Sequence, residues 1–157
     1  MAYLLTIIAI TSFNWGAVSV KHPVDRSVIN VANVLHLTNE DRVKAGLQGL
    51  NESKYLDSLA QSRASDEATH ENFSHIDSHG KRAYEEVNIS IYPYKDFGEN
   101  LAIMFMDAQS EEAAFMQSPE HRDNILNPSY KDIGIAVEEG KYGNATTTYV
   151  TIEFGDD

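Results

Sequence analysis

The C-terminal part of the chain holds the pattern that most restricts its fold. Two segments rich in strand-forming residues, DIGIAVEEG at 132–140 and TTTYVTIEFG at 146–155, flank the short polar sequence KYGN. β-branched residues favour strands, and a glycine-asparagine pair between two such segments is typical of a tight turn. We therefore predict a β-hairpin at this end of the chain, so the domain must contain an antiparallel sheet.

The first half of the folded region has helical patterns. Apolar residues recur at helical spacing from Val28 to Lys44, and a second helical stretch extends from about Ser53 to Glu71. Small alanines lie on one side of the second stretch, which indicates close packing against a neighbouring layer. Residues 72–80 are rich in serine, aspartate, asparagine and glycine, so we expect a loop there.

In the second half of the folded region, we expect short helices and a strand to follow one another. We expect a short helix at about 81–87, an apolar strand or a strand-to-helix entry at 99–106, and a helix over 108–117. Ser118-Pro119 should begin another helix, because serine suits the N-cap and proline the first helical position. Asn127-Pro128 should end it. The order of elements predicts an α+β domain with helices packed on a mainly antiparallel sheet.

Composition limits the classes of function. The 157 residues are enough for one domain with a substantial core. The 24 acidic and 12 basic side chains give a formal net charge of -12. Such a surface repels nucleic-acid phosphates, so we expect no nucleic-acid partner. The sequence has no cysteine, which excludes disulfides, thiolate metal sites and a cysteine nucleophile.

The N-terminal segment indicates export. Residues 1–20 carry no charged side chain and are typical of a signal peptide, with Ala17 and Ser19 as small residues before a cleavage site. A membrane anchor is the alternative, because about 18 apolar residues can just span a bilayer; a buried first strand is disfavoured, since Thr, Ser and Asn interrupt the segment without a period of two. Residues 21–27 are interpreted as a polar linker and residues 28–157 as the folded domain. Both alternatives predict a secreted, extracellular or cell-envelope protein that touches a membrane only through an uncleaved N-terminal segment.

Three short motifs could carry chemistry. Phe73-Ser74-His75 follows the second helical stretch, Gly98-Glu99-Asn100 lies where the chain enters the apolar strand, and SPEHRDNIL covers 118–126. In this order the motifs resemble those of the CAP superfamily (SCP-like domains), which groups cysteine-rich secretory proteins, antigen 5 and pathogenesis-related proteins. The resemblance is closest to its cysteine-free bacterial branch and covers about residues 30–155. Further matches are Asn39-Glu40-Asp41-Arg42, Asp132-Ile133-Gly134 and Phe154-Gly155.

The resemblance implies a fold and a set of cleft residues. The family fold is a three-layer α-β-α sandwich with helices on both faces of a central, mainly antiparallel sheet. A central cleft in the family holds two histidines and two glutamates. His75 matches the first histidine, Glu99 the first glutamate and His121 the second histidine. Ser118 stands where eukaryotic members have the second glutamate, so the implied site is a reduced one.

These cleft residues suggest a binding site. Two imidazoles and a carboxylate are suitable ligands for a divalent cation such as zinc, with water in the open positions. We expect His75 and His121 as metal ligands, with Glu99 either as a third ligand or as the group that orients one imidazole. The expected function is therefore an exported module that binds a weakly held metal ion or a small ligand, with an extracellular partner that the sequence does not identify. A histidine-glutamate contact that only joins layers of the fold is the alternative.

A hydrolase is a second hypothesis for the same residues. Ser118 would be the nucleophile, His121 the base and Glu99 the group that orients the base. Ser118 and His121 are three residues apart at a helix start, which permits contact. The capping role is the simpler interpretation of Ser118, and no oxyanion hole can be identified in the sequence. A lipid-binding domain and a purely structural envelope module are further alternatives.

Overall fold

The computed structural model describes residues 28–157. The predictions of a signal peptide or anchor at 1–20 and of a linker at 21–27 lie outside these residues. No helix within them is both long enough and apolar enough to cross a bilayer. The elements follow the chain in the order α1 (Val31–Lys44), β1 (Asn51–Glu52), α2 (Lys54–His70), α3 (Ala83–Glu86), β2 (Phe97–Ile103), α4 (Ala108–Gln117), α5 (Pro119–Ile125), β3 (Asp132–Tyr142) and β4 (Ala145–Gly155).

The hairpin predicted near the C-terminus forms the centre of the sheet. β3 and β4 pair antiparallel over their whole length, and the pairing ends at Tyr142 opposite Ala145. Gly143 and Asn144 therefore form a two-residue turn. Gly143 has a φ of 61°, which lies in the left-handed region that glycine adopts without strain. Glycine at the first turn position is typical of a type II′ hairpin, whose twist matches that of the strands.

The other two strands lie at the edges of the sheet, in the order β1-β3-β4-β2. β2 pairs antiparallel with β4, and β1 pairs parallel with β3, so the sheet is mainly antiparallel as predicted. β2 covers 97–103 rather than the expected 99–106, because its pairing with β4 runs from Phe97 to Ile103. Sequence pattern does not reveal β1, since two exposed residues that pair through the backbone leave no periodicity.

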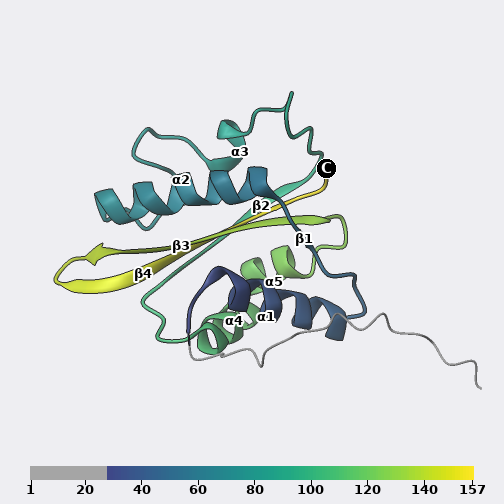
Figure 1. Cartoon of the computed structure of the whole chain (residues 1–157), viewed down its shortest axis with the longest axis horizontal. Helices are drawn as coiled ribbons and strands as arrows, with labels where there is room; N and C mark the ends of the chain where they lie inside the picture. The colour runs from purple at the N-terminus through teal and green to yellow at the C-terminus, as the bar shows by residue number, and fades with distance from the viewer. Residues whose placement is uncertain (1–27) are drawn as a thin grey trace, which may run out of the picture.

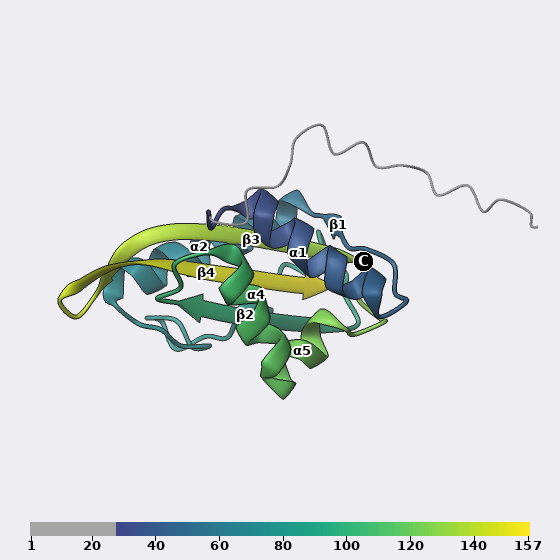
Figure 2. The ribbon, with the colours of Figure 1, turned by 90° about the horizontal axis from the view of Figure 1, so that it is seen from below.

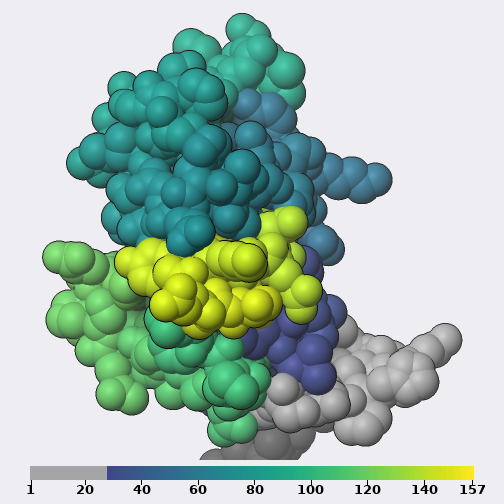
Figure 3. Space-filling model, turned by 90° about the vertical axis from the view of Figure 1, so that its left-hand side faces the viewer, coloured from purple at the N-terminus to yellow at the C-terminus, as the bar shows by residue number. Residues whose placement is uncertain are grey.

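The helices form two layers, one on each face of the sheet. α2 and α3 lie on one face, and α1, α4 and α5 lie on the other (Figure 1), as the view turned by 90° also shows (Figure 2). The turn end of the β3–β4 hairpin emerges between these two layers (Figure 3). The structure thus confirms the three-layer α-β-α sandwich that the family resemblance implies.

The two faces of the sheet differ because side chains alternate along a strand. Ile133 and Phe154 belong to a large apolar core between the sheet and the α1, α4 and α5 layer. On the opposite face, Ala136 packs against Ala60 and Ala64 of α2, and all three are buried. These small side chains let α2 approach the sheet closely, as the alanine pattern predicted.

Local capping explains where two of the helices begin. Asn30 begins α1, because its side chain accepts a hydrogen bond from the Asn33 N–H at 2.9 Å. The helix therefore starts three residues later than the expected Val28. Ser118 occupies the N-cap position before Pro119, as predicted, but its side chain makes no capping hydrogen bond. Ser118 therefore stands at the predicted cap position, but its side chain does not cap α5. Its own backbone N–H ends α4.

Arg42 connects α1 to the segment that leads from α5 into β3. Its Nε donates to the Gln48 carbonyl at 2.9 Å. One terminal nitrogen donates to the carbonyls of Ile125 at 2.7 Å and Asn127 at 2.9 Å, and the other reaches Tyr130 O at 3.2 Å. The side chain is only 2% exposed. A buried guanidinium with four carbonyl acceptors is well satisfied, so Arg42 holds the end of α5 in place.

Two buried carboxyl groups lie on α4, outside the family motifs. Glu111 is 1% exposed, and neither of its carboxyl oxygens has a hydrogen-bond partner among residues 28–157. Burial, with a smaller contribution from Glu112, raises the pKa of Glu111 to about 8. Burial likewise raises the pKa of Glu112 to about 7, although Thr38 donates to it at 3.1 Å. The core therefore favours the neutral form of both groups.

Replacing Gly134 should test the close approach of α2 to the sheet. A Cβ at Gly134 would overlap the backbone of Leu56 and Asp57, which cannot move without shifting α2. We expect Gly134→Ala to lower the free energy of unfolding by at least about 2 kcal/mol in urea titrations. Gly49→Ala is the control, because its Cβ would meet only the Asn39 side chain, at 3.2 Å. Equal losses in the two variants would contradict this account of the packing.

The buried carboxyl group of Glu111 should make stability depend on pH. The folded state keeps this proton up to about pH 8, whereas the unfolded chain releases it near about pH 4.3. Glu111 thus stabilises the fold fully below that lower value, and the contribution is lost as pH rises toward 8. The slope approaches about 1.4 kcal/mol per pH unit between the two values. Glu111→Gln should remove this part of the slope in urea titrations from about pH 5 to 8. Glu139→Gln, at a position outside the core, should leave it unchanged.

Candidate functional site

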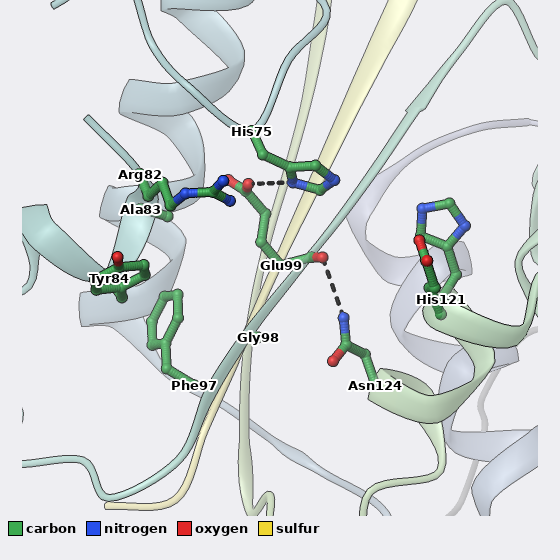
Figure 4. A pocket seen from close by; sticks show the side chains of 10 residues that line it. His75, Arg82, Ala83, Tyr84, Phe97, Gly98, Glu99, His121 and Asn124 are labelled. Carbon is green, nitrogen blue, oxygen red and sulfur yellow. Dashed lines mark hydrogen bonds and ion pairs between the residues drawn. The ribbon is translucent and has the colours of Figure 1, made fainter. Parts of the chain in front are cut away.

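A pocket of about 270 Å³ lies beside the edge strand β2. His75 and Arg82 line it from the loop after α2 and the start of α3, and His121 lines it from α5. Figure 4 shows His75 and Arg82 on one side of β2 and His121 and Asn124 on the other. Both helical layers therefore contribute residues to the pocket, which lies at the edge of the sheet. Its remaining wall includes Phe97, Gly98 and Glu99 of β2 itself.

The register of the sheet explains this arrangement. Glu99 of β2 is opposite Glu153 of β4, and its side chain lies on the face covered by α2, where Arg63 contacts it. The next residue, Asn100, has its side chain on the other face, where it donates to the His121 carbonyl at 3.1 Å. Consecutive residues of one edge strand thus contact both layers.

His75 and Glu99 form the central contact of the site. His75 Nδ1 lies 2.6 Å from Glu99 Oε1 (Figure 4). Because a carboxylate accepts, Nδ1 of His75 is the donor, and in the neutral imidazole this tautomer has its lone pair on Nε2. The Glu99 side chain is 8% exposed and the His75 side chain 49% exposed, so the carboxylate is fixed inside the protein while the imidazole meets solvent.

Arg63 holds the other oxygen of the same carboxylate. Its Nε donates to Glu99 Oε2 at 3.2 Å, and a terminal nitrogen donates to the Lys81 carbonyl at 3.1 Å. Asp77 and Glu86 lie 3.8 and 3.9 Å from the same guanidinium. The side chain of Arg63 is only 2% exposed. Arg63 therefore fixes the carboxylate that in turn orients His75.

Further carboxyl groups lie beneath this contact. Glu153 is completely buried, and burial followed by the charge of Glu99 raises its pKa well above the ordinary range. Burial and the charge of Glu99 also raise the pKa of Glu67 to about 8. One guanidinium, from Arg63, cannot compensate three buried negative charges. Burial therefore favours the neutral form of Glu153 and Glu67, while the carboxyl group of Glu99 contacts both His75 and Arg63.

His121 sits on the opposite side of the pocket in a more apolar setting. Its ring meets the Phe115 ring edge-on, with the ring centroids 5.1 Å apart. Burial lowers the pKa of His121, the nearby His75 lowers it further, and Glu120 raises it. The imidazole is thus favoured in its neutral form, which is the form that can act as a metal ligand or hydrogen-bond acceptor.

Two asparagines attach α5 to the strand. Asn124 donates to the Glu99 carbonyl at 3.1 Å and to Asn100 Oδ1 at 2.8 Å (Figure 4). Asn100 donates to the carbonyl of His121, as described above. Each asparagine thus binds a backbone carbonyl of the other element. They fix the start of α5, and with it His121, against the edge of β2.

The donor set accommodates a metal ion only partly. Within residues 28–157, no group of three or more histidine, aspartate or glutamate side chains is arranged to hold one. Both oxygens of Glu99 already have partners, so the available donors are Nε2 of His75 and the ring of His121. Two imidazoles leave the remaining positions of a tetrahedral ion to water or to a ligand. The contact of Glu99 with His75 is of the kind by which a carboxylate orients an imidazole.

The structure does not bring the residues of the hydrolase hypothesis together. The Glu99 carboxylate is bound to His75 rather than to His121. Ser118 is not among the pocket residues. It stands between α4 and α5, where its backbone ends one helix and begins the next.

Sequence reasoning missed several pocket residues and the support beneath them. Arg63 had a detectable signal, because it interrupts the small and apolar stripe of α2 formed by Leu56, Ala60 and Ala64. A charged residue in such a stripe indicates a buried ion pair. Arg82 lies outside any motif, and only its position at the start of α3 brings it to the pocket. Other pocket residues that were not expected at the site are Tyr84, Phe97 and Glu120.

Sequence comparisons give relatives of the chain. The family described as "Cysteine-rich secretory protein family" (CAP) matches residues 35–154. The Bacillus subtilis (strain 168) protein YkwD is 32% identical over 108 residues, which cover 68% of this chain and 42% of YkwD. The membrane protein YlbC of the same organism is 27% identical over 109 residues, which cover 69% of this chain and 32% of YlbC. The chain thus spans less than half the length of these curated relatives.

Solved structures have the same fold. An extracellular protein containing an SCP domain from Bacillus anthracis str. Ames superposes with a TM-score of 0.65 at 21% identity, covering 80% of this chain and 40% of that protein. An outer surface protein from Borrelia burgdorferi gives 0.64 at 18% identity, covering 78% of this chain and 89% of that protein. The family match over most of the folded domain and the shared fold lead to one conclusion. The chain belongs to the CAP family, and it does so without a single cysteine.

Proposed function

We propose that this chain is an exported CAP-domain protein whose pocket binds a divalent metal ion through His75 and His121. In this proposal the protein is a binding module and its pocket residues perform no chemical turnover. A bound ion would supply positive charge and open coordination positions for an oxygen or nitrogen of a ligand. The residues of the protein hold the ion, orient its ligands and leave one side of the pocket open.

The contact between His75 and Glu99 carries this proposal. At 2.6 Å, the carboxylate fixes the tautomer of the imidazole and holds its Nε2 ready as a ligand. Arg63 in turn keeps the carboxylate in place from beneath. Such a carboxylate-histidine pair is the usual support of a metal-bound imidazole. A contact that only joined layers of the fold would not need a half-exposed histidine at a pocket wall.

The setting of His121 supports the same role. Its pKa is lowered mainly by burial, so it stays available as a neutral ligand at lower pH than an exposed histidine. The pocket is open, and the chain has an acidic excess that favours cations over anions at long range.

Export is supported by the N-terminal sequence and by relatives. Residues 1–20 lack charged side chains and match a signal peptide or an anchor. One structural relative is described as extracellular and another as an outer surface protein. YlbC is described as a membrane protein, which agrees with either secretion or attachment to the cell envelope. In this proposal the pocket therefore lies outside the cytoplasm.

Zinc titration should test the metal site. We expect calorimetry at neutral pH to give a single weak site in the wild-type protein. His75→Ala and His121→Ala should each weaken it by at least about tenfold, since each removes one of two imidazole ligands. His79→Ala is the matched control, because His79 lies in the same loop as His75 but its side chain is 77% exposed and outside the pocket. Zinc binding that survives both pocket substitutions would remove this proposal.

The role of Glu99 can be separated from that of the ligands. Glu99→Gln keeps the size of the side chain but removes the charge that fixes His75. We expect zinc affinity to fall about 10–100-fold, as is typical when the partner of a ligating histidine is lost. Glu120→Gln, a charge loss at the pocket beside His121, should have a much smaller effect. Histidine NMR spectra should show His75 losing its single tautomer in Glu99→Gln only. An unchanged tautomer would argue against orientation by Glu99.

A further inference from the structure

Arg82 gives the pocket a second kind of binding group. This residue directly precedes α3 and lines the pocket together with His75 and Glu99. Figure 4 shows its side chain on the α3 side of the pocket, across from His121. Among residues 28–157, no carboxylate lies within ion-pair distance of its guanidinium. A guanidinium on a pocket wall of a protein with 24 acidic side chains and without such a partner is available to a ligand.

The carboxylates near Arg82 are already engaged elsewhere. Both oxygens of Glu99 are held, one by His75 and one by Arg63. The backbone N–H of Arg82 binds Glu85 at 2.8 Å, which positions the residue without using its guanidinium. The Arg82 guanidinium is therefore a cationic group of the pocket that forms no ion pair with the residues described. An incoming anion would meet a planar, two-pronged donor there.

The wall next to Arg82 is aromatic. Tyr84 and Phe97 both line the pocket, and Tyr84 is 48% exposed. On the far side, Glu120 places a negative charge beside His121. This distribution favours one negative group at the Arg82 side and disfavours a second one at the Glu120 side. The space of about 270 Å³ suits a small organic molecule rather than a folded partner.

We propose that the pocket recognises small organic monocarboxylates that carry an aromatic or apolar group, with Arg82 binding the carboxylate and Phe97 and Tyr84 packing against the rest. The inference rests on the proposed use of this pocket for binding, and it names the class of ligand. The same chemistry occurs in free organic acids and at the C-terminus of a peptide. The imidazole of His121 lies across the pocket from Arg82 and faces the other end of the ligand.

The test uses two carboxylates and their neutral amides as probes. Phenylacetate represents a free acid and N-acetylphenylalanine a peptide terminus, and phenylacetamide and N-acetylphenylalaninamide are the matched controls. Affinities are measured by NMR titration of the whole domain in chelator and again with zinc. We expect at least one carboxylate to bind while its amide binds at least about tenfold more weakly, since the charge-assisted hydrogen bonds to Arg82 are lost.

Variants assign the effect to Arg82. Arg82→Gln should weaken carboxylate binding at least about tenfold in chelator, and Arg82→Lys should give an intermediate value, because lysine keeps the charge and loses the two-pronged geometry. Arg122→Gln is the control, since it removes a guanidinium from α5 that does not line the pocket. Backbone NMR spectra establish that each variant is folded. A preference for the peptide terminus or for the free acid then identifies the source of the ligand.

The outcomes separate this inference from the metal site. Carboxylate binding that depends on Arg82 in chelator supports the inference, even if zinc fails to bind. Zinc binding together with equal carboxylate affinity in wild type and Arg82→Gln overturns the inference and leaves the metal proposal intact. Failure of both carboxylates to bind the folded wild-type domain in chelator and in zinc also overturns it.

Discussion

The close approach of α2 to β3 at Gly134 positions the wall of the pocket that follows α2 in the chain. The helix backbone at Leu56 and Asp57 occupies the space of a missing side chain, so the helix lies directly on the sheet. The Ile135 N–H donates to the Asp57 carboxylate at 3.1 Å, which fixes the register of the helix along the strand. Further along α2, Arg63 reaches the Glu99 carboxylate. The position of His75 thus depends on how α2 packs on the sheet, through Arg63 and Glu99.

The buried carboxyl groups change how the charge of this protein should be understood. The formal net charge of -12 counts every acidic side chain as ionised. Burial raises the pKa of Glu67, Glu111 and Glu112 to about 8, about 8 and about 7, and that of Glu153 well above its ordinary value. The folded chain near neutral pH is therefore less negative than its composition suggests. Among the buried carboxyl groups, Glu99 is the one that contacts both Arg63 and His75.

Elements that depend on interactions between residues close in the sequence could be predicted from it, and elements that depend on distant residues could not. The hairpin and the helices over 54–70 and 108–117 depend on local patterns and caps, so periodicity located them well. β1 could not be found, because two exposed residues pair through backbone groups that every residue has.

The site required information that spacing does not hold. His75 and Glu99 are 24 positions apart and meet only because a loop folds back over the sheet edge. The family resemblance pointed to His75, Glu99 and His121, and the structure brings all three to one pocket. It could not indicate that Glu99 uses both oxygens for internal partners, or that Arg82 remains without an ion-pair partner in the described part of the chain. Those facts depend on distances between side chains from different layers.

The place of the pocket at the edge of the sheet has a mechanical consequence. His75 belongs to one helical layer and His121 to the other, and the shared element between them at this point is β2, an edge strand paired on one side only. A ligand that contacts both histidines forms a second bridge between the layers, outside the sheet. Such a bridge resists sliding of one layer over the other. A bound ligand would therefore stiffen the whole edge of the domain rather than change its shape locally.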